Sequence, residues 1–542
     1  MFNDSLEIRL NLHIDGKDFS IPCGNIKYLK CELYQYGFES IVNFWISSEE
    51  KSDVLYPHFI TNKIIEVNLD IYAHFTEKDQ DKKVKSITLS GIVTKKAILD
   101  ELVIENVHLK KNPVLYRCYQ IVFKDRAQVL LKQHYPTDLV TNKKIKDLFV
   151  KNTPSKVTIK YNWQFLNKDY AINTLPLGSP KNKASFYDFI IWFVNKYNGV
   201  FNYNYRDKCY YVTNTKEQSD KFSIVNKKDI SSYYITFLNQ PRYNIEILNV
   251  CSKNVQKKTI QYDSSIKDIE KTIIINTPIS SIYEEEVSLE REKTKRVATH
   301  RVNVYFNHFL NIKLCPNDLI KFSGPNWSKE QFIKEKIYRI NYVSFEATAL
   351  NKEADSDLNM PHNRYSIRQE IILEPKDDES VSLPDFIEPY FPLLVEGYVV
   401  SEIGRDNEYT YQIHQHPQTS VDQYKIKIPL FNNQEVVAPF EPIFSPGHFY
   451  FPVYKGARVL ISLNLHDAYI KRFLEWKEGA RLPSDTQGDH LLLGKNAKNQ
   501  TSISHIYIDD KPVLKIKRIN QTDTQLVKIE EGTITIETKE EE

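Results

Sequence analysis

The sequence YKIKIPL (residues 424–430), together with VVAPFEPIFSPGHFYFPVYKGARVLISLNLHDAYIKRFLEW (residues 436–476), decides the fold. Apolar residues stand at alternate positions in both segments: Tyr424, Ile426 and Ile428, then Val459, Ile461 and Leu463. A period of two places these side chains on one face of a strand. Turn-forming residues separate the strands at Pro446-Gly447, Pro452 and Lys455-Gly456. Short strands with tight connections are typical of a five-stranded OB-type barrel.

The spacing of these turns resembles the OB domain of VgrG spike proteins of type VI secretion, which are similar to the hub and spike of contractile phage tails. The residues that carry the resemblance are Gly447, Phe451-Pro452, Gly456 and the apolar strand 459–461. Where the usual family member has an acidic Gly-Asp-Pro turn after the last strand, this chain has Leu465-His466-Asp467-Ala468. The resemblance therefore indicates a divergent member.

The resemblance implies a mainly β, multidomain chain. It predicts two hub-type β-barrels with a small α/β insertion, an OB-fold barrel and a short trimeric β-helical needle. The expected domains are 1–155 (hub barrel 1), 156–235 (helix–hairpin insertion), 236–385 (hub barrel 2), 386–480 (OB fold) and 481–542 (needle).

Composition and net charge argue against several other classes of protein. The 542 residues are 41% hydrophobic and 12% aromatic, enough for several cores. With 72 basic and 70 acidic residues, the net charge of +2 gives no global attraction to nucleic acid or an anionic membrane. The start alternates apolar and polar residues and so predicts a strand, with no signal peptide. The six cysteines form no CxxC pair, and we expect buried thiols.

The first 155 residues are rich in strand patterns. Strands are expected at 6–14, 64–71, 84–93 and 115–123, with a hairpin turn at Asp15-Gly16 and a helix from Asn142 to Val150. In the insertion, Ser185 and Asp188 form a capping box, and apolar residues at helical spacing follow until Asn198-Gly199. A strand pair, 200–205 and 209–213, is expected after the helix. We expect the aromatic stripe of this helix to be core.

The segment 236–385 reads as the second barrel. Its expected strands are 245–247, 260–262, 272–275, 302–306, 312–314, 320–322 and 337–343. The turn Cys315-Pro316-Asn317-Asp318 resembles the family's Gly-Asp element. Acidic residues 284–286 precede Lys293, Lys295 and Arg296, an order of charges that favours a helix. This helix is interpreted as solvated, or else as a docking surface for a baseplate protein.

An acidic, proline-interrupted linker, residues 375–392, leads to the OB domain. The OB domain is expected to begin with residues 397–400. The final strands are expected to be short: 503–508, 513–519, 526–529 and 534–536, with turns at Asp509-Asp510, 520–524 and Glu531-Gly532. None of these strands can bury itself alone. Three chains in a prism could bury them around a shared axis.

No catalytic, cofactor-binding or metal-binding residues are assigned. The chain contains no GxxxxGK[ST], GxGxxG, HExxH or GxSxG motif. His414 and His416 are the one close histidine pair, and no cysteine or acidic residue is spaced to complete a metal site with them. We therefore expect no enzyme and no cofactor.

The expected function is a structural hub and spike of a bacterial contractile injection machine. The resemblance implies a homotrimer, an Hcp-like tube protein, baseplate proteins, a PAAR-like tip protein and effectors as partners, with assembly in the cytoplasm followed by injection through a target membrane. A phage-like or extracellular tail hub is an alternative. A nucleic-acid-binding OB fold is disfavoured, because residues 391–480 hold 8 basic and 10 acidic side chains, net −2. A wall-binding or hydrolytic tail protein has only the abundance of Tyr and Phe in its favour.

Overall fold

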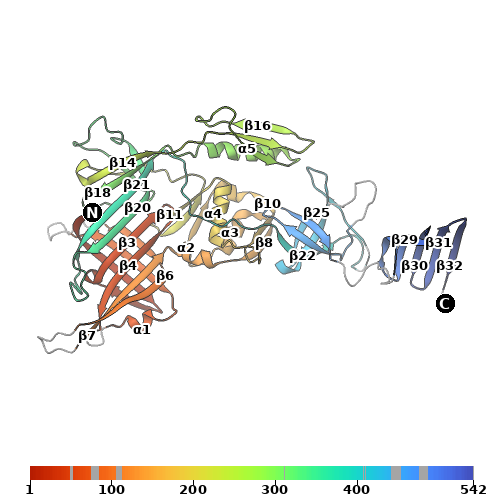
Figure 1. Cartoon of the computed structure of the whole chain (residues 1–542), viewed down its shortest axis with the longest axis horizontal. Coiled ribbons are helices and arrows are strands. Elements are labelled where there is room, and N and C mark those ends of the chain that lie inside the picture. Colours follow the sequence, from red (N-terminus) through yellow and green to blue (C-terminus); the bar gives the residue numbers. More distant parts are fainter. Residues whose placement is uncertain are drawn as a thin grey trace. The chain divides into compact units, whose positions relative to one another are not determined.

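The chain is mainly β and has several domains, as expected (Figure 1). The computed structural model describes residues 1–48, 53–74, 85–104, 113–310, 312–406, 408, 410–440, 453–474 and 486–540. They form two compact units. Unit 1 comprises 1–137, 144–169 and 176–390, and unit 2 comprises 138–143, 170–175 and 391–542.

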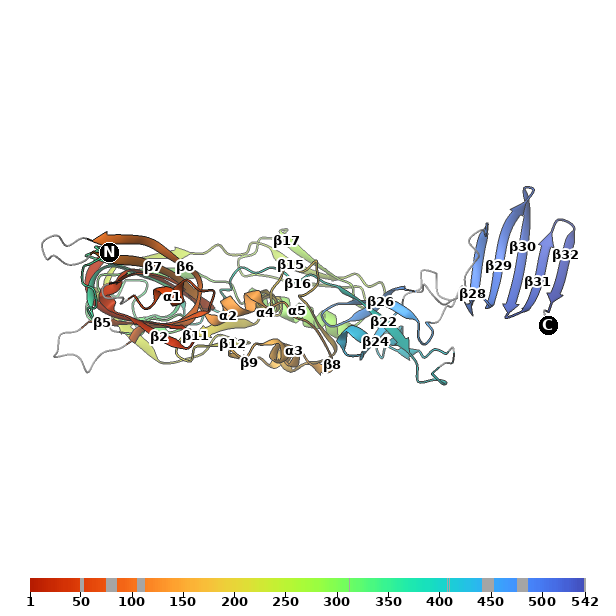
Figure 2. The ribbon, with the colours of Figure 1, turned by 90° about the horizontal axis from the view of Figure 1, so that it is seen from below.

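Eight antiparallel strands of unit 1 form a closed ring, called here the first ring (Figure 2). The order is β20-β3-β4-β7-β6-β5-β1-β21, and pairing of β20 with β21 closes it. The strands are β1 (Phe2–Ile14), β3 (Ile26–Tyr34), β4 (Gly37–Ser47), β5 (Ile65–Ala73), β6 (Lys85–Ile104), β7 (Val114–Lys124), β20 (Ile337–Ala349) and β21 (Asn363–Pro375). The first ring therefore takes strands from both of the segments 1–155 and 236–385.

A second array, called the side sheet, shares β20 and β21 with the first ring. Its other strands are β13 (Phe222–Val225), β14 (Ile230–Phe237), β18 (His300–Phe306) and β19 (Leu319–Phe322). β20 pairs with β19 through Ile337–Arg339 and with β3 from Tyr342 onward, and its register shifts between Ile340 and Tyr342. This irregularity lets one long strand serve both arrays.

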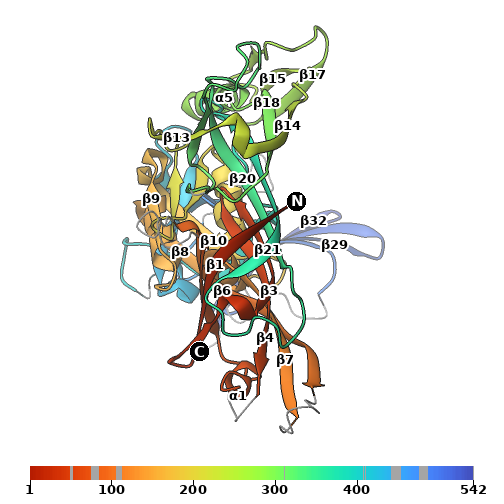
Figure 3. The same cartoon turned by 90° about the vertical axis from the view of Figure 1, so that its left-hand side faces the viewer.

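A small module interrupts the β14–β18 hairpin. It contains β15 (Asn244–Asn249), β16 (Gln256–Ile260), β17 (Glu270–Ile275) and α5 (Ser280–Thr294) (Figure 3). Its own core consists of Ile245, Ile247, Ile260, Tyr283 and Val287. The helix expected from the acidic residues 284–286 to the basic residues 293–296 is confirmed, but the expected strands at 245–247, 260–262 and 272–275 do not join the second barrel. They form a separate three-stranded sheet under α5, because their apolar face packs on Tyr283 and Val287.

The helix α4 (Phe186–Lys196) confirms the sequence prediction. The Ser185 hydroxyl accepts a hydrogen bond from the Asp188 amide (3.2 Å), and the Asp188 carboxylate accepts one from the Ser185 amide (2.9 Å). The hairpin β11 (Val200–Asn204) and β12 (Cys209–Thr213) follows, and β9 (Ile159–Asn162) pairs in parallel with β12. The aromatic stripe of α4 is buried core, as expected.

Shorter elements belong to unit 1, except that most of β8 and β10 belongs to unit 2. They are β2 (Lys17–Ile21), α1 (Tyr56–Phe59), α2 (Arg126–Leu130), β8 (Thr137–Lys144), α3 (Ile145–Asn152) and β10 (Asp169–Pro176). The expected helix 142–150 begins at Ile145 instead, because Asn142 continues strand β8. Residues 312–314 form no strand.

Unit 2 contains a six-stranded sheet, one strand more than expected, and it confirms the strands predicted from the alternation at residues 424–428 and 459–463. Its strands are β22 (Leu393–Val400), β23 (His414–Gln415), β24 (Asp422–Ile428), β25 (Gln434–Pro439), β26 (Arg458–Leu463) and β27 (Ala468–Phe473). Tyr424, Ile426 and Ile428 are buried in one core with Val459, Ile461 and Leu463. Gly456 lies at the expected turn, with a φ of 81°. Gly447, Phe451, Pro452 and Trp476 lie outside the described residues.

Gly37, the first residue of β4 after the β3–β4 turn, has a φ of 141°, which favours glycine. A Cβ there would lie 2.2 Å from Asp125 Oδ2, a buried carboxylate that accepts hydrogen bonds from the amides of Phe38 and Gln128. We expect Gly37→Ala to lower the free energy of unfolding by about 3 kcal/mol, from backbone strain plus displacement of Asp125. Denaturant unfolding measures the loss.

Gly16→Ala is the matched control, because Gly16 also has a positive φ (80°) but nothing lies within 4 Å of its Cβ position. It should cost only the strain, about 1 kcal/mol. Equal losses in both variants would show that the Asp125 contact contributes nothing.

Candidate functional site

The C-terminal residues fold into a five-stranded antiparallel sheet, called the C-terminal sheet (Figure 2). Its strands are β28 (Asp489–Asn496), β29 (Asn499–Ile508), β30 (Lys511–Asn520), β31 (Asp523–Glu530) and β32 (Thr533–Lys539). The expected turns are confirmed: Asp509, Asp510, Gln521 and Gly532 all have positive φ. Such two-residue turns match the twist of a hairpin and fix its register. The strands are longer than the sequence pattern indicated.

This register gathers apolar side chains on one face of the C-terminal sheet. Directly paired residues form a row across all five strands: Leu491, Ile503, Ile516, Val527 and Ile536. Leu514, Ile529 and Ile534 form an adjacent row on the same face. Directly paired residues share a face because side chains alternate along each strand. We call these eight residues the apolar face.

The opposite face is polar near its centre. Ser502 pairs with Lys517, Ser504 with Lys515, and Lys528 with Thr535.

The apolar face is exposed in the single chain. The exposed fractions of Ile516, Ile529, Ile534 and Ile536 are 40%, 41%, 68% and 78%. Burying such a side chain fully gains about 1.5–3 kcal/mol. The apolar face therefore has a strong tendency to be covered.

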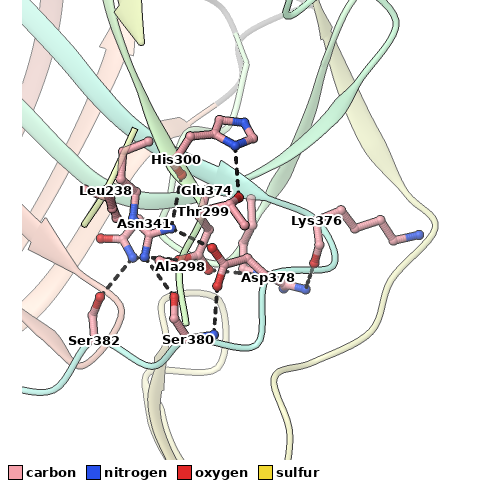
Figure 4. A network of polar contacts seen from close by, with 12 residues as sticks. Leu238, Ala298, Thr299, His300, Asn341, Glu374, Lys376, Asp378, Ser380 and Ser382 are labelled. Atoms are coloured by element: carbon pink, nitrogen blue, oxygen red, sulfur yellow. Dashed lines mark hydrogen bonds and ion pairs between the residues drawn. The ribbon is translucent and has the colours of Figure 1, made fainter. Parts of the chain in front are cut away.

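A second feature is a buried cluster of charges where the first ring and the side sheet share strands. Glu374, at the end of β21, is completely buried and accepts hydrogen bonds from Gln35 (3.0 Å) and Asn341 (2.9 Å). It also pairs with the Lys216 ammonium and lies 3.4 Å from Arg301. Figure 4 shows Asn341 between Glu374 and Ser382.

The charges of this cluster extend along the segment that follows β21. Arg301 donates to Asp378 Oδ2 and to Ser380 Oγ, both at 2.9 Å. Arg339, 1% exposed, donates to the carbonyl of Glu217. Burial lowers the pKa of Lys216 and of Arg339. The two carboxylates, Glu374 and Asp378, therefore hold three cations in place, and Glu374 is the one that all three approach.

No sequence pattern pointed to this cluster. Gln35, Lys216 and Glu374 are far apart along the chain, and a single charged residue at the end of an apolar strand carries no distinctive pattern. One signal was available. Glu374 directly follows three apolar residues, 371–373, in a strand, and an unpaired carboxylate at a buried position there would be costly.

The histidine pair singled out by sequence consists of His414 and His416. His414 lies in β23, and His416 Nδ1 accepts hydrogen bonds from the amides of Gln418 and Thr419. Within the described residues no group of three His, Cys, Asp or Glu side chains could hold a metal ion. No helix in the described part is long and apolar enough to cross a membrane.

All six cysteines are unpaired thiols, and five are buried. Burial raises the pKa of Cys31 and Cys315 to about 12 and that of Cys118 to about 11. These thiols stay protonated at neutral pH and are poor nucleophiles and ligands. The prediction of buried thiols is confirmed for all but Cys251, which is partly exposed.

Comparison with known proteins gives no matching family model and no matching curated protein sequence. Solved structures do match. A chain of a PdpA–VgrG complex in its lidless form has 12% identity and a TM-score of 0.70, with 98% of each chain covered. In the half-lidded Francisella PdpA–VgrG complex the identity is 12% and the TM-score 0.69, over 98% of this chain and 88% of that chain. For the lidded form of the Francisella complex the identity is 13% and the TM-score 0.69, over 99% of this chain and 80% of that chain.

This likeness spans nearly the whole chain and both compact units. At 12–13% identity it establishes the fold and leaves the activity to be proposed. The resemblance to VgrG-type hub-spike proteins that the sequence indicated is confirmed at the level of the fold.

Proposed function

We propose that the protein is the central hub and spike subunit of a bacterial contractile injection machine of the type VI kind, with a mechanical and not a catalytic role. Three copies would join through the apolar faces of their C-terminal sheets, forming a needle. The six-stranded sheet of unit 2 would be the OB-fold base of that needle. The first ring and side sheet would form the hub that meets the tube.

The apolar face carries this proposal. A sheet with one polar and one apolar side must bury its apolar side against another surface. Assembly around a closed rotation axis provides that surface, and no apolar face is then left exposed for a further copy to bind. Around a three-fold axis each chain would contribute one side of a prism, and isoleucines of three chains would fill the shared interior. The likeness to a chain of PdpA–VgrG complexes supports the same architecture.

Oligomeric state tests the proposal. Light scattering at micromolar concentration should give about three times the chain mass of 63.7 kDa. The trimer should persist in 0.5 M salt, because apolar contacts are not screened. A monomer with an intact C-terminal sheet would contradict the proposal.

The other partners follow from this role. We propose an Hcp-like tube protein and baseplate proteins at the hub, and effectors as cargo. The particle would assemble in the bacterial cytoplasm and leave with the tube when the sheath contracts. No part of this role calls for a nucleic acid or a cofactor.

A separate tip protein of the PAAR type is proposed at the end of the needle. β32 pairs with β31 alone among the described strands, so its outer edge is open. Open edges invite association unless they are covered. Residues 521–542 hold 7 acidic and 2 basic side chains, net −5, which favours a cap with basic residues at its rim.

Electron microscopy of intact particles tests the tip protein. We expect a cone of density beyond the last strand that disappears when residues 526–542 are deleted. Density that ends with β32 in the full-length particle would refute it.

A further inference from the structure

A cavity of about 420 Å³ lies in unit 1, between two turns that the proposed function does not use. One is the β11–β12 turn around Arg206 and Asp207, and the other is the turn at residues 315–318 before β19. The polar segment 213–221 supplies a third wall. The volume lies in the range of small-ligand sites, large enough for a side chain with its backbone.

The wall of the cavity is rich in hydrogen-bond acceptors and aromatic rings. Tyr203, Tyr205 and Tyr211 line it. Within the described residues, no donor reaches Asn317 Oδ1 or Asp318 Oδ2, although both atoms are shielded from solvent. Burial raises the pKa of Asp318, since little water reaches its carboxylate. Buried acceptors of this kind favour a ligand that donates hydrogen bonds.

Arg206 forms an ion pair with the other carboxylate oxygen of Asp318, Oδ1. Its Nη2 lies 2.7 Å from Asp318 Oδ1, but its side chain is 63% exposed, whereas that of Asp318 is 21% exposed. An ion pair with one member in solvent is weak, so Arg206 can be displaced at little cost. Asp207, the neighbouring acid, already accepts a hydrogen bond from Tyr211 (3.1 Å).

We propose that this cavity binds a cationic side chain of a partner protein, an arginine or a lysine, and that Asp318 exchanges its internal partner Arg206 for the incoming cation. The incoming group would donate to both Asp318 and Asn317, and the tyrosine rings would flank it as cation–π partners. Arg206 thus acts as a built-in competitor. The inference concerns unit 1 and does not depend on trimer formation.

The test uses the full-length protein and the capped peptide acetyl-Gly-Arg-Gly-amide, with the isosteric neutral citrulline peptide as its control. Binding is followed by titration calorimetry. The wild type should bind the arginine peptide and not the citrulline peptide. Arg206→Gln should bind the arginine peptide about two- to fivefold more tightly, since the competing exposed pair is gone.

Asp318→Asn should weaken binding of the arginine peptide by about tenfold or more, through loss of a charge-assisted hydrogen bond. Asp220→Asn serves as the control, because the carboxylate of Asp220 pairs with Lys376 and does not line the cavity, and it should change binding less than twofold. Circular dichroism confirms that each variant is folded.

Three outcomes would overturn the inference. They are equal binding of the citrulline peptide, unchanged or weaker binding by Arg206→Gln, and no binding by folded wild type and folded Arg206→Gln at 20 mM peptide. Tighter binding of spermidine than of the arginine peptide would overturn the assignment to a protein partner, in favour of a free polyamine.

Discussion

Replacing Ile534 and Ile536 together by aspartate should abolish the trimer. Both side chains lie on the apolar face, where Ile534 pairs with Ile529 and Ile536 with Val527. In the proposed needle the substitutions place six carboxylates around one axis, at a cost of several kcal/mol per site. Light scattering at micromolar concentration should then report monomers. Helix α4, in unit 1, should remain folded by circular dichroism.

Thr535→Asp provides the matched control for this experiment. Thr535 lies between the two isoleucines in sequence but on the opposite face, directly across from Lys528. A carboxylate there gains a cross-strand partner and should leave the trimer intact. If Thr535→Asp and the double isoleucine variant trimerise equally well, the apolar face is not the interface.

Replacing Glu374 by glutamine should give the largest loss of stability within unit 1. The change keeps the shape but leaves Lys216, Arg301 and Arg339 around a single remaining carboxylate, Asp378. Removing one partner from a buried ion cluster typically costs about 3–5 kcal/mol. We expect thermal unfolding of unit 1 to shift downward by several degrees, and hydrogen exchange in β20 and β21 to accelerate.

Glu353→Gln is the control, because Glu353 is exposed and should change stability by less than about 0.5 kcal/mol. A second variant, Glu374→Leu with Lys216→Met, removes one charge of each sign. It should recover part of the stability, since well-packed apolar side chains can replace a buried ion pair. If Glu374→Gln were as stable as Glu353→Gln, the cluster would make no net contribution.

Local patterns predicted much of the fold, because they depend on neighbours in sequence. The capping box at Ser185, the turn at Asp15-Gly16 and the alternation at residues 424–428 were each readable from a few residues, and the structure confirms all three. The turns of the C-terminal sheet were readable in the same way. The strand expected at 534–536 is confirmed as part of β32.

The choice of strand partners could not be predicted from such patterns. Alternation says which side chains share a face, but it does not say which strand lies alongside. Sequence patterns therefore placed the strands at 245–247, 260–262 and 272–275 in a barrel that they do not join. They also missed β3 and β4, and did not indicate that β20 and β21 belong to two arrays. The charge cluster at Glu374 was missed for the same reason, because its members meet only after these strands pair.

The closure of the first ring by β20 and β21 has a consequence for synthesis of the chain. The first six strands end at Lys124 and β20 begins at Ile337, so 212 residues (337 − 124 − 1) separate them. At roughly 5–20 residues per second, a ribosome needs about 10–40 s to make that length. During this interval the edges of β1 and β3 lack the partners that later cover them, at Phe2↔Ile367 and Tyr34↔Tyr342. Nascent chains and fragments that stop before residue 375 are thus the forms most prone to aggregate, and their solubility would depend on a chaperone that shields those edges.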